Sequence, residues 1–127
     1  MFDSFSIQKK SGRIIGLAMA GLLAVGVAGC SPTKPEVTAS AEGVTAAVEV
    51  SAVDNAYYPQ TVTVKVGEAV RWTFDGGAKH DVVAADGSFV SELQKDGSFT
   101  HVFTEPGKYD YDCSIHPEMR GTVIVEE

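Results

Sequence analysis

The chain has 127 residues, a formal net charge of −7 and a composition in which 44% of the residues are hydrophobic. This length leaves room for one domain and little else. The acidic balance argues against nucleic-acid binding and favours protein partners with basic patches, whose association slows as the salt concentration rises.

An export signal is predicted over residues 1–29. Three cations, Lys9, Lys10 and Arg13, precede an uncharged run of 16 residues at 14–29. Because a membrane-spanning helix needs roughly 20 apolar residues, a cleaved signal is favoured over the alternative of a retained anchor. Its removal leaves 7 basic and 16 acidic side chains, and thus a formal charge of −9.

Cys30 directly follows the small residues Ala28 and Gly29. The tetrapeptide Val27–Cys30 resembles the lipobox of bacterial lipoproteins, in which the cysteine becomes the first mature residue and carries lipid. The alternative is an ordinary signal peptide cut near Ala28, which would leave Cys30 as a free thiol. We expect a lipid-anchored protein on a bacterial membrane, facing the periplasm or the outer surface of the cell.

Residues 30–47 are predicted to form a flexible tether between this anchor and a folded domain. From Ser31 onward the segment is rich in Ser, Thr, Pro, Glu and Ala and has almost no large apolar side chains. A segment of this composition buries too little surface to order itself.

Short β-strands are predicted from Val48 onward. Alternation of apolar and polar residues predicts three strands, over 48–53, 61–66 and 69–74. The sequence Asp75-Gly76-Gly77 is predicted to break the third strand. A further strand over 78–83 would then carry His80 near its start.

The rest of the chain continues the same pattern. Asp-Gly-Ser-Phe occurs twice, at 86–89 and 96–99, and both copies are predicted to be turns. Alternating aromatic residues follow at 99–103, another strand runs up to Cys113, and a last strand covers 121–125. Six to eight short strands without a helix predict an all-β sandwich at 48–127.

Three soft or borderline metal donors lie within seven residues, in the pattern Cys113-x-x-His116-x-x-Met119. A thiolate, an imidazole and a thioether can hold copper in both of its common oxidation states. One more nitrogen is needed, and either His80 or His101 could supply it. Two histidines and a cysteine with a weak axial methionine form a blue-copper electron-transfer site. Such a site needs no open position for a substrate, which argues against an enzyme.

Taken singly, these residues have simpler interpretations. A lone cysteine or methionine is usually a buried core residue. His101 shares a face with Phe99 and Phe103 and is expected to pack among them. The combined spacing of Cys113, His116 and Met119 nevertheless favours a metal site.

Residues 104–125 resemble the C-terminal part of the plastocyanin-like blue copper proteins, and most closely the amicyanin type. The two-residue gap between His116 and Met119 is the short gap of that type. The resemblance covers about 48–126 and implies a cupredoxin-like Greek-key sandwich of eight strands. It also implies one type 1 copper per chain with four ligands: His80, Cys113, His116 and Met119.

One position departs from the family pattern. Similar proteins usually have Asn after the first histidine ligand, where its side chain helps to pin the two ligand loops together, but this chain has Asp81. A carboxylate accepts hydrogen bonds and, when ionised, cannot donate them. We expect either a different contact between the loops or a shifted reduction potential.

We expect a monomer that shuttles single electrons between extracytoplasmic redox partners, whose identity stays open. The resemblance also implies that the edge of His116 is the electron port, with Ile115 and Pro117 on its rim. An alternative function is copper sequestration or delivery. A third possibility is a structural sandwich that binds no metal.

Overall fold

The structure is a computed structural model, and it describes residues 34–127. The predicted signal peptide at 1–29 and the predicted lipidation site at Cys30 lie outside the described residues.

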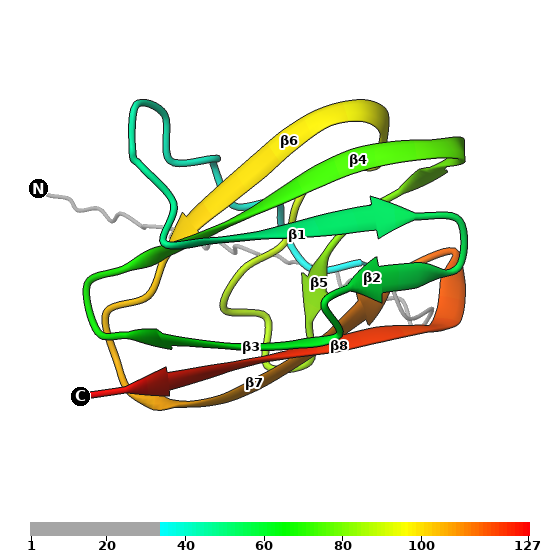
Figure 1. Ribbon diagram of the computed structural model, residues 1–127. Coiled ribbons are helices and arrows are strands. Elements are labelled where there is room, and N and C mark those ends of the chain that lie inside the picture. Colours follow the sequence, from blue (N-terminus) through cyan, green and yellow to red (C-terminus); the bar gives the residue numbers. More distant parts are fainter. Residues whose placement is uncertain (1–33) are drawn as a thin grey trace, which may run out of the picture. The chain divides into compact units, whose positions relative to one another are not determined.

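Eight strands and no helix form the described part of the chain. They are β1 (Val48–Val53), β2 (Ala56–Tyr58), β3 (Thr61–Lys65), β4 (Ala69–His80), β5 (Val83–Ala84), β6 (Gln94–Val102), β7 (Gly107–Cys113) and β8 (His116–Glu126). They make two four-stranded sheets, in the orders β2-β1-β4-β6 and β3-β8-β7-β5. Figure 1 shows these sheets as two facing layers, which confirms the predicted all-β sandwich.

Both sheets are mixed, because the chain crosses between them. β1 pairs in parallel with β4, and β3 pairs in parallel with β8, whereas the other named pairs are antiparallel. As a result, the end of β4 in one sheet and the β7–β8 hairpin in the other sheet can contribute to a single site.

The core is built from the inward faces of both sheets. Val70, Trp72 and Phe74 are at most 3% exposed, which confirms the predicted shared face. The Trp72 ring lies 5.5 Å from Phe89 and 5.4 Å from Tyr111, measured between ring centroids. These contacts join the two sheets, since Trp72 lies on β4 and Tyr111 on β7.

The predicted break at 75–77 is wrong. β4 continues to His80 with an irregular register after Asp75, so His80 ends a strand instead of starting one. Glycine at 76 permits a close approach of Asp54: a Cβ there would lie 2.5 Å from Oδ1 of Asp54. Gly76 and Gly77 therefore make room for a neighbouring side chain within a continuous strand.

Only one of the two Asp-Gly-Ser-Phe copies is a turn. Oδ1 of Asp86 accepts a hydrogen bond from the amide of Ser88 at 2.9 Å, and Gly87 has a φ of 78°. The second copy lies within β6, where Asp96 pairs with Asp75. The prediction of a turn at 96–99 is wrong because pairing with β4 overrides the local preference for a turn.

The segment 34–47 is not the free tether that its composition suggests. It contains no strand, but the amide of Thr38 donates to the carbonyl of Val90 at 2.7 Å, and the amide of Ala41 donates to the carbonyl of Thr100 at 2.9 Å. In return, the hydroxyl of Ser40 accepts from the amide of Thr100 at 3.0 Å. Hydrogen bonds to the sandwich thus replace the apolar burial that this segment lacks.

Gly121 lies opposite Tyr111 in the β7–β8 pair, and Tyr111 is 3% exposed. A Cβ at 121 would overlap the hydroxyl and ring carbons of Tyr111. We expect Gly121→Ala to cost about 1–3 kcal/mol by overpacking and to lower the melting temperature by several degrees, measured by circular dichroism. In a Tyr111→Leu background the same change should cost less than half as much, and equal costs in both backgrounds would contradict this explanation.

Candidate metal centre

Three of the predicted donors converge where the two sheets meet. Cys113 ends β7 and pairs with His116 at the start of β8, so only Ser114 and Ile115 connect the strands. The Sγ of Cys113 lies 3.7 Å from Nδ1 of His116 and 3.8 Å from Nδ1 of His80. All three donor atoms lie within 4.8 Å of one another.

These distances fit a single metal ion. With metal–ligand bonds of about 2.0–2.3 Å, two ligands at about 120° to each other are about 3.5–3.8 Å apart. The donor set of two imidazoles and one thiol, with a thioether nearby in sequence, is that of a blue-copper site. Cys113 and His80 are at most 1% exposed, so the protein shields these donors from water.

Met119 lies on β8, three residues after His116. Its side chain is fully buried and belongs to the same apolar cluster as Cys113. This position suits the weak axial ligand that the resemblance implies.

His101 lies elsewhere, on β6, outside the group of converging donors. Its ring lies 5.1 Å from that of Phe89 and 4.8 Å from that of Phe103, between centroids. The expectation that His101 packs among aromatic rings is confirmed.

Burial lowers the pKa of His101, so the folded protein favours its neutral form. The unfolded chain binds a proton at this residue below about pH 6.5. The contribution of His101 to the free energy of unfolding is therefore complete above that pH and declines as the pH falls towards the lowered folded-state pKa. We expect His101→Phe to flatten this part of the stability profile between about pH 7 and 5, measured by urea unfolding. A parallel shift of the whole profile would contradict the explanation.

A carboxylate fixes the orientation of His80. Oδ1 of Asp54 lies 3.1 Å from Nε2 of His80 and accepts from the amides of Gly77 at 3.0 Å and Ala78 at 3.3 Å. With Nε2–H donating to Asp54, the lone pair lies on Nδ1, which faces the thiol of Cys113. Asn55 has a φ of 68°, a conformation that Asn tolerates well, and so allows the tight turn that carries Asp54.

Sequence reasoning missed the role of Asp54. It identified Asp54-Asn55 only as a turn signal, although the acidic residue in that turn and the two glycines before His80 belong together in the fold. Their separation of more than 20 residues hides the pairing from a local pattern.

Asp81 joins the two ligand segments, as its place in the family pattern suggests. Its carboxylate accepts from the amide and from the hydroxyl of Ser114, both at 2.7 Å, and Nζ of Lys34 lies 2.8 Å from Oδ2. Burial opposes ionisation of Asp81, but the hydrogen bonds from Lys34 and Ser114 outweigh it and lower its pKa. Asp81 thus joins the two ligand segments only through its carboxylate oxygens as acceptors. Its ion pair with Lys34 was not predicted from the sequence.

Burial raises the pKa of the Cys113 thiol, so without a metal ion Sγ keeps its proton to a higher pH than an ordinary thiol does. Binding of a metal ion must therefore displace a proton from Sγ.

The surface around His116 is partly apolar. His116 itself is partly buried, whereas Ile115 is 50% exposed. Nε of Arg120 donates to the carbonyl of Pro117 at 3.0 Å, which braces the segment after His116.

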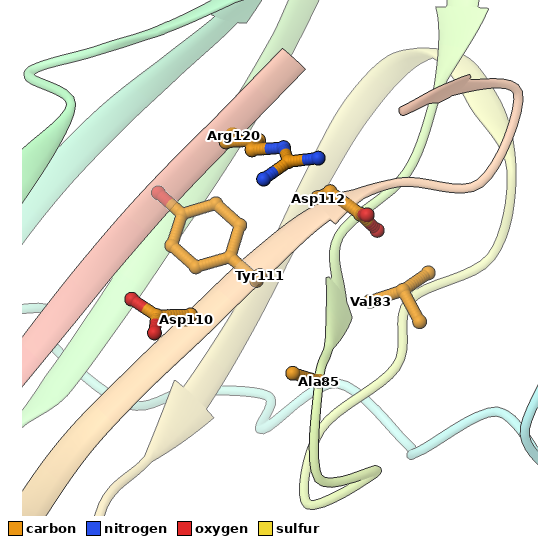
Figure 2. A pocket seen from close by; sticks show the side chains of 6 residues that line it. All are labelled: Val83, Ala85, Asp110, Tyr111, Asp112 and Arg120. Atoms are coloured by element: carbon orange, nitrogen blue, oxygen red, sulfur yellow. The ribbon is translucent and has the colours of Figure 1, made fainter. Parts of the chain in front are cut away.

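A separate pocket lies beside β5, β7 and β8, and Figure 2 shows its lining residues: Val83, Ala85, Asp110, Tyr111, Asp112 and Arg120. Burial raises the pKa of Asp112, and the nearby charge of Arg120 partly offsets this effect. The pocket contains none of the four predicted ligands.

Residues 19–125 match the family model of the cupredoxin-like domain, and the chain belongs to this family of β-sandwich proteins. Within it, the amicyanins are similar to this chain. It is 34% identical to amicyanin of Paracoccus versutus over 122 residues, covering 87% of this chain and 92% of the relative. It is 32% identical to plastocyanin of Dryopteris crassirhizoma over 89 residues, covering 55% of this chain and 87% of that relative.

Solved structures show the same similarity. A reduced Cu(I) form of an amicyanin mutant at pH 4 has a TM-score of 0.59 and 34% identity, covering 72% of this chain and 92% of that structure. A purple cupredoxin from Nitrosopumilus maritimus has a TM-score of 0.57 and 30% identity, covering 62% and 99%. The predicted membership in the plastocyanin-like and amicyanin-like proteins is confirmed.

Proposed function

We propose that this protein is a type 1 copper electron carrier with His80, Cys113, His116 and Met119 as its ligands. The observation that carries the proposal is the position of the Cys113 thiol, 3.7 and 3.8 Å from the Nδ1 atoms of two histidines. Copper, when bound, supplies a centre that gains and loses one electron.

The residues of the chain keep the site rigid. Cys113 and His116 are fixed by strand pairing, and His80 is fixed by Asp54. Electron transfer is fast when neither oxidation state requires rearrangement, so a preformed ligand set suits it. Because the donors of His80, Cys113 and Met119 are buried, we propose that the protein is not an enzyme.

The visible spectrum of the copper-loaded domain tests this function. We expect intense blue or green absorption in the oxidised protein that disappears on one-electron reduction and returns on oxidation. A colourless protein that binds only Cu(I) would instead support copper sequestration or delivery.

We also propose that residues 1–29 are a signal peptide, that Cys30 carries lipid and that the copper domain acts outside the cytoplasm. The support is the charged start, apolar run and lipobox-like Val27–Cys30 of the sequence. In residues 34–127, no helix is long and apolar enough to cross a membrane. Cys30→Ser should move the protein from the membrane fraction to the soluble fraction, with the copper colour unchanged.

The partners would be redox proteins that dock near His116. Ile115 offers an apolar contact, and the formal charge of −9 that remains without residues 1–29 favours partners with basic surfaces. We propose a monomer that exchanges electrons with such partners in turn.

A further inference from the structure

Lys34 and Asp81 form an ion pair between the N-terminal segment and the metal end of the domain. Nζ of Lys34 lies 2.8 Å from Oδ2 of Asp81, and the side chains are 27% and 0% exposed. Ser114 donates both its amide and its hydroxyl to the same carboxylate. Donors from two distant segments thus meet on a buried carboxylate that directly follows His80 in the sequence and is bonded to Ser114, the residue after Cys113.

The buried carboxylate needs a counter-charge. An uncharged Asn at this position, as in similar proteins, would not need one, but an isolated carboxylate is costly to bury. Among residues 34–127, Lys34 is the cation that pairs with Asp81. The hydrogen bonds of Thr38 and Ala41 to the sandwich hold the segment that delivers it.

We propose that Lys34 is a positioning residue of the metal centre. It balances the charge of Asp81, keeps this carboxylate bonded to Ser114 next to Cys113, and fastens the N-terminal segment to the metal end of the domain.

The ion pair also limits the distance between the metal end of the domain and the membrane, an inference that rests on the proposed lipidation of Cys30. Three residues separate Cys30 from Lys34, so the four Cα–Cα steps between them span at most about 14 Å. Without the ion pair, the next bond between this segment and the sandwich is the hydrogen bond from Thr38 to Val90, and the reach from Cys30 doubles to about 28 Å. The ion pair therefore holds the metal end close to the bilayer, which suits a one-electron partner bound to the same membrane.

The reduction potential of the copper-loaded mature protein tests the positioning role independently of lipid. Loss of the cation should favour the oxidised state, in which the copper carries one more positive charge. Lys34→Met should therefore shift the one-electron equilibrium several-fold to about tenfold, which corresponds to a reduction potential lower by up to about 59 mV. The amide of Ser114 should also exchange its hydrogen faster, whereas Lys34→Arg should retain both properties. Lys79→Met is the matched control, because Lys79 is an exposed lysine beside His80.

A double-mutant cycle separates this role from that of a distant charge. In an Asp81→Asn background, Lys34→Met should change the potential by less than half as much as it does in the parent. Equal shifts in both backgrounds, or an unchanged potential and unchanged Ser114 exchange in Lys34→Met, would overturn the proposal.

The orientation is tested with oxidised, copper-loaded mature protein on phosphatidylcholine vesicles that contain a nitroxide-labelled headgroup lipid. Cu(II) should enhance nitroxide relaxation, and Lys34→Met should weaken this enhancement at least twofold. Equal enhancement in both proteins would overturn the orientation. Protein that stays in solution would instead contradict lipidation, without affecting the result for the potential.

Discussion

Replacing Cys113 by serine should abolish the intense visible absorption of the oxidised, copper-loaded domain. The thiol lies 3.7 and 3.8 Å from the Nδ1 atoms of two histidines and is fully buried, and residues 34–127 contain no other cysteine. A serine hydroxyl is a hard donor that does not deprotonate readily, and it suits copper less well than a thiolate in both oxidation states. Absorption spectra and copper titrations of the variant measure both effects.

Cys30→Ser is the matched control, because it removes the other cysteine of the chain. It should leave the colour and the copper affinity unchanged. A Cys113→Ser protein that keeps the colour would refute the proposed ligand set altogether.

Removal of the Asp54 carboxylate should weaken copper binding about 10-fold to 100-fold, the usual effect of losing a group that orients a histidine ligand. In Asp54→Ala, the ring of His80 loses its partner at Nε2, and the amides of Gly77 and Ala78 lose their acceptor. Asp54→Asn keeps an acceptor without the charge, so its affinity should lie between those of the parent and Asp54→Ala. Competition titration with a copper chelator measures the affinities.

The nitrogen chemical shifts of His80 in the metal-free protein provide a second measurement. Asp54 should hold the proton on Nε2, and Asp54→Ala should populate both tautomers. Asp75→Ala, which removes an exposed acid from the same strand as His80, should change neither affinity nor tautomer. The role assigned to Asp54 fails if Asp54→Ala behaves like this control.

The sequence predicted the fold class because strand signals are local. Alternation at 48–53 and 61–66 places Val50, Ala52, Val62 and Val64 in the core, and the structure confirms their burial. The errors occurred where pairing with another strand outweighs local preference. Asp75–Gly77 and Asp96-Gly97 look like turns, yet both lie within strands: in the pairing of β4 with β6, Asp75 lies opposite Asp96 and Phe74 lies opposite Gly97.

Three of the four proposed ligands could be predicted together, since Cys113, His116 and Met119 lie within seven residues of one hairpin, and a short segment fixes their order and spacing. His80 needed the family resemblance, because nothing in its local sequence distinguishes it from His101 as a nitrogen donor. The structure separates them by topology: His80 ends β4 beside the hairpin, whereas His101 lies on β6 among aromatic rings.

The sequence by itself thus determined the donor types, their spacing and the all-β class, because these depend on residue chemistry and on contacts between near neighbours. Only the tertiary structure decided what surrounds the donors. Asp54 reaches His80 across 26 residues and Lys34 reaches Asp81 across 47, through a turn and an irregular segment whose composition alone predicts no contact. Such pairs form only after the sheets have brought distant segments together, so no local pattern records them.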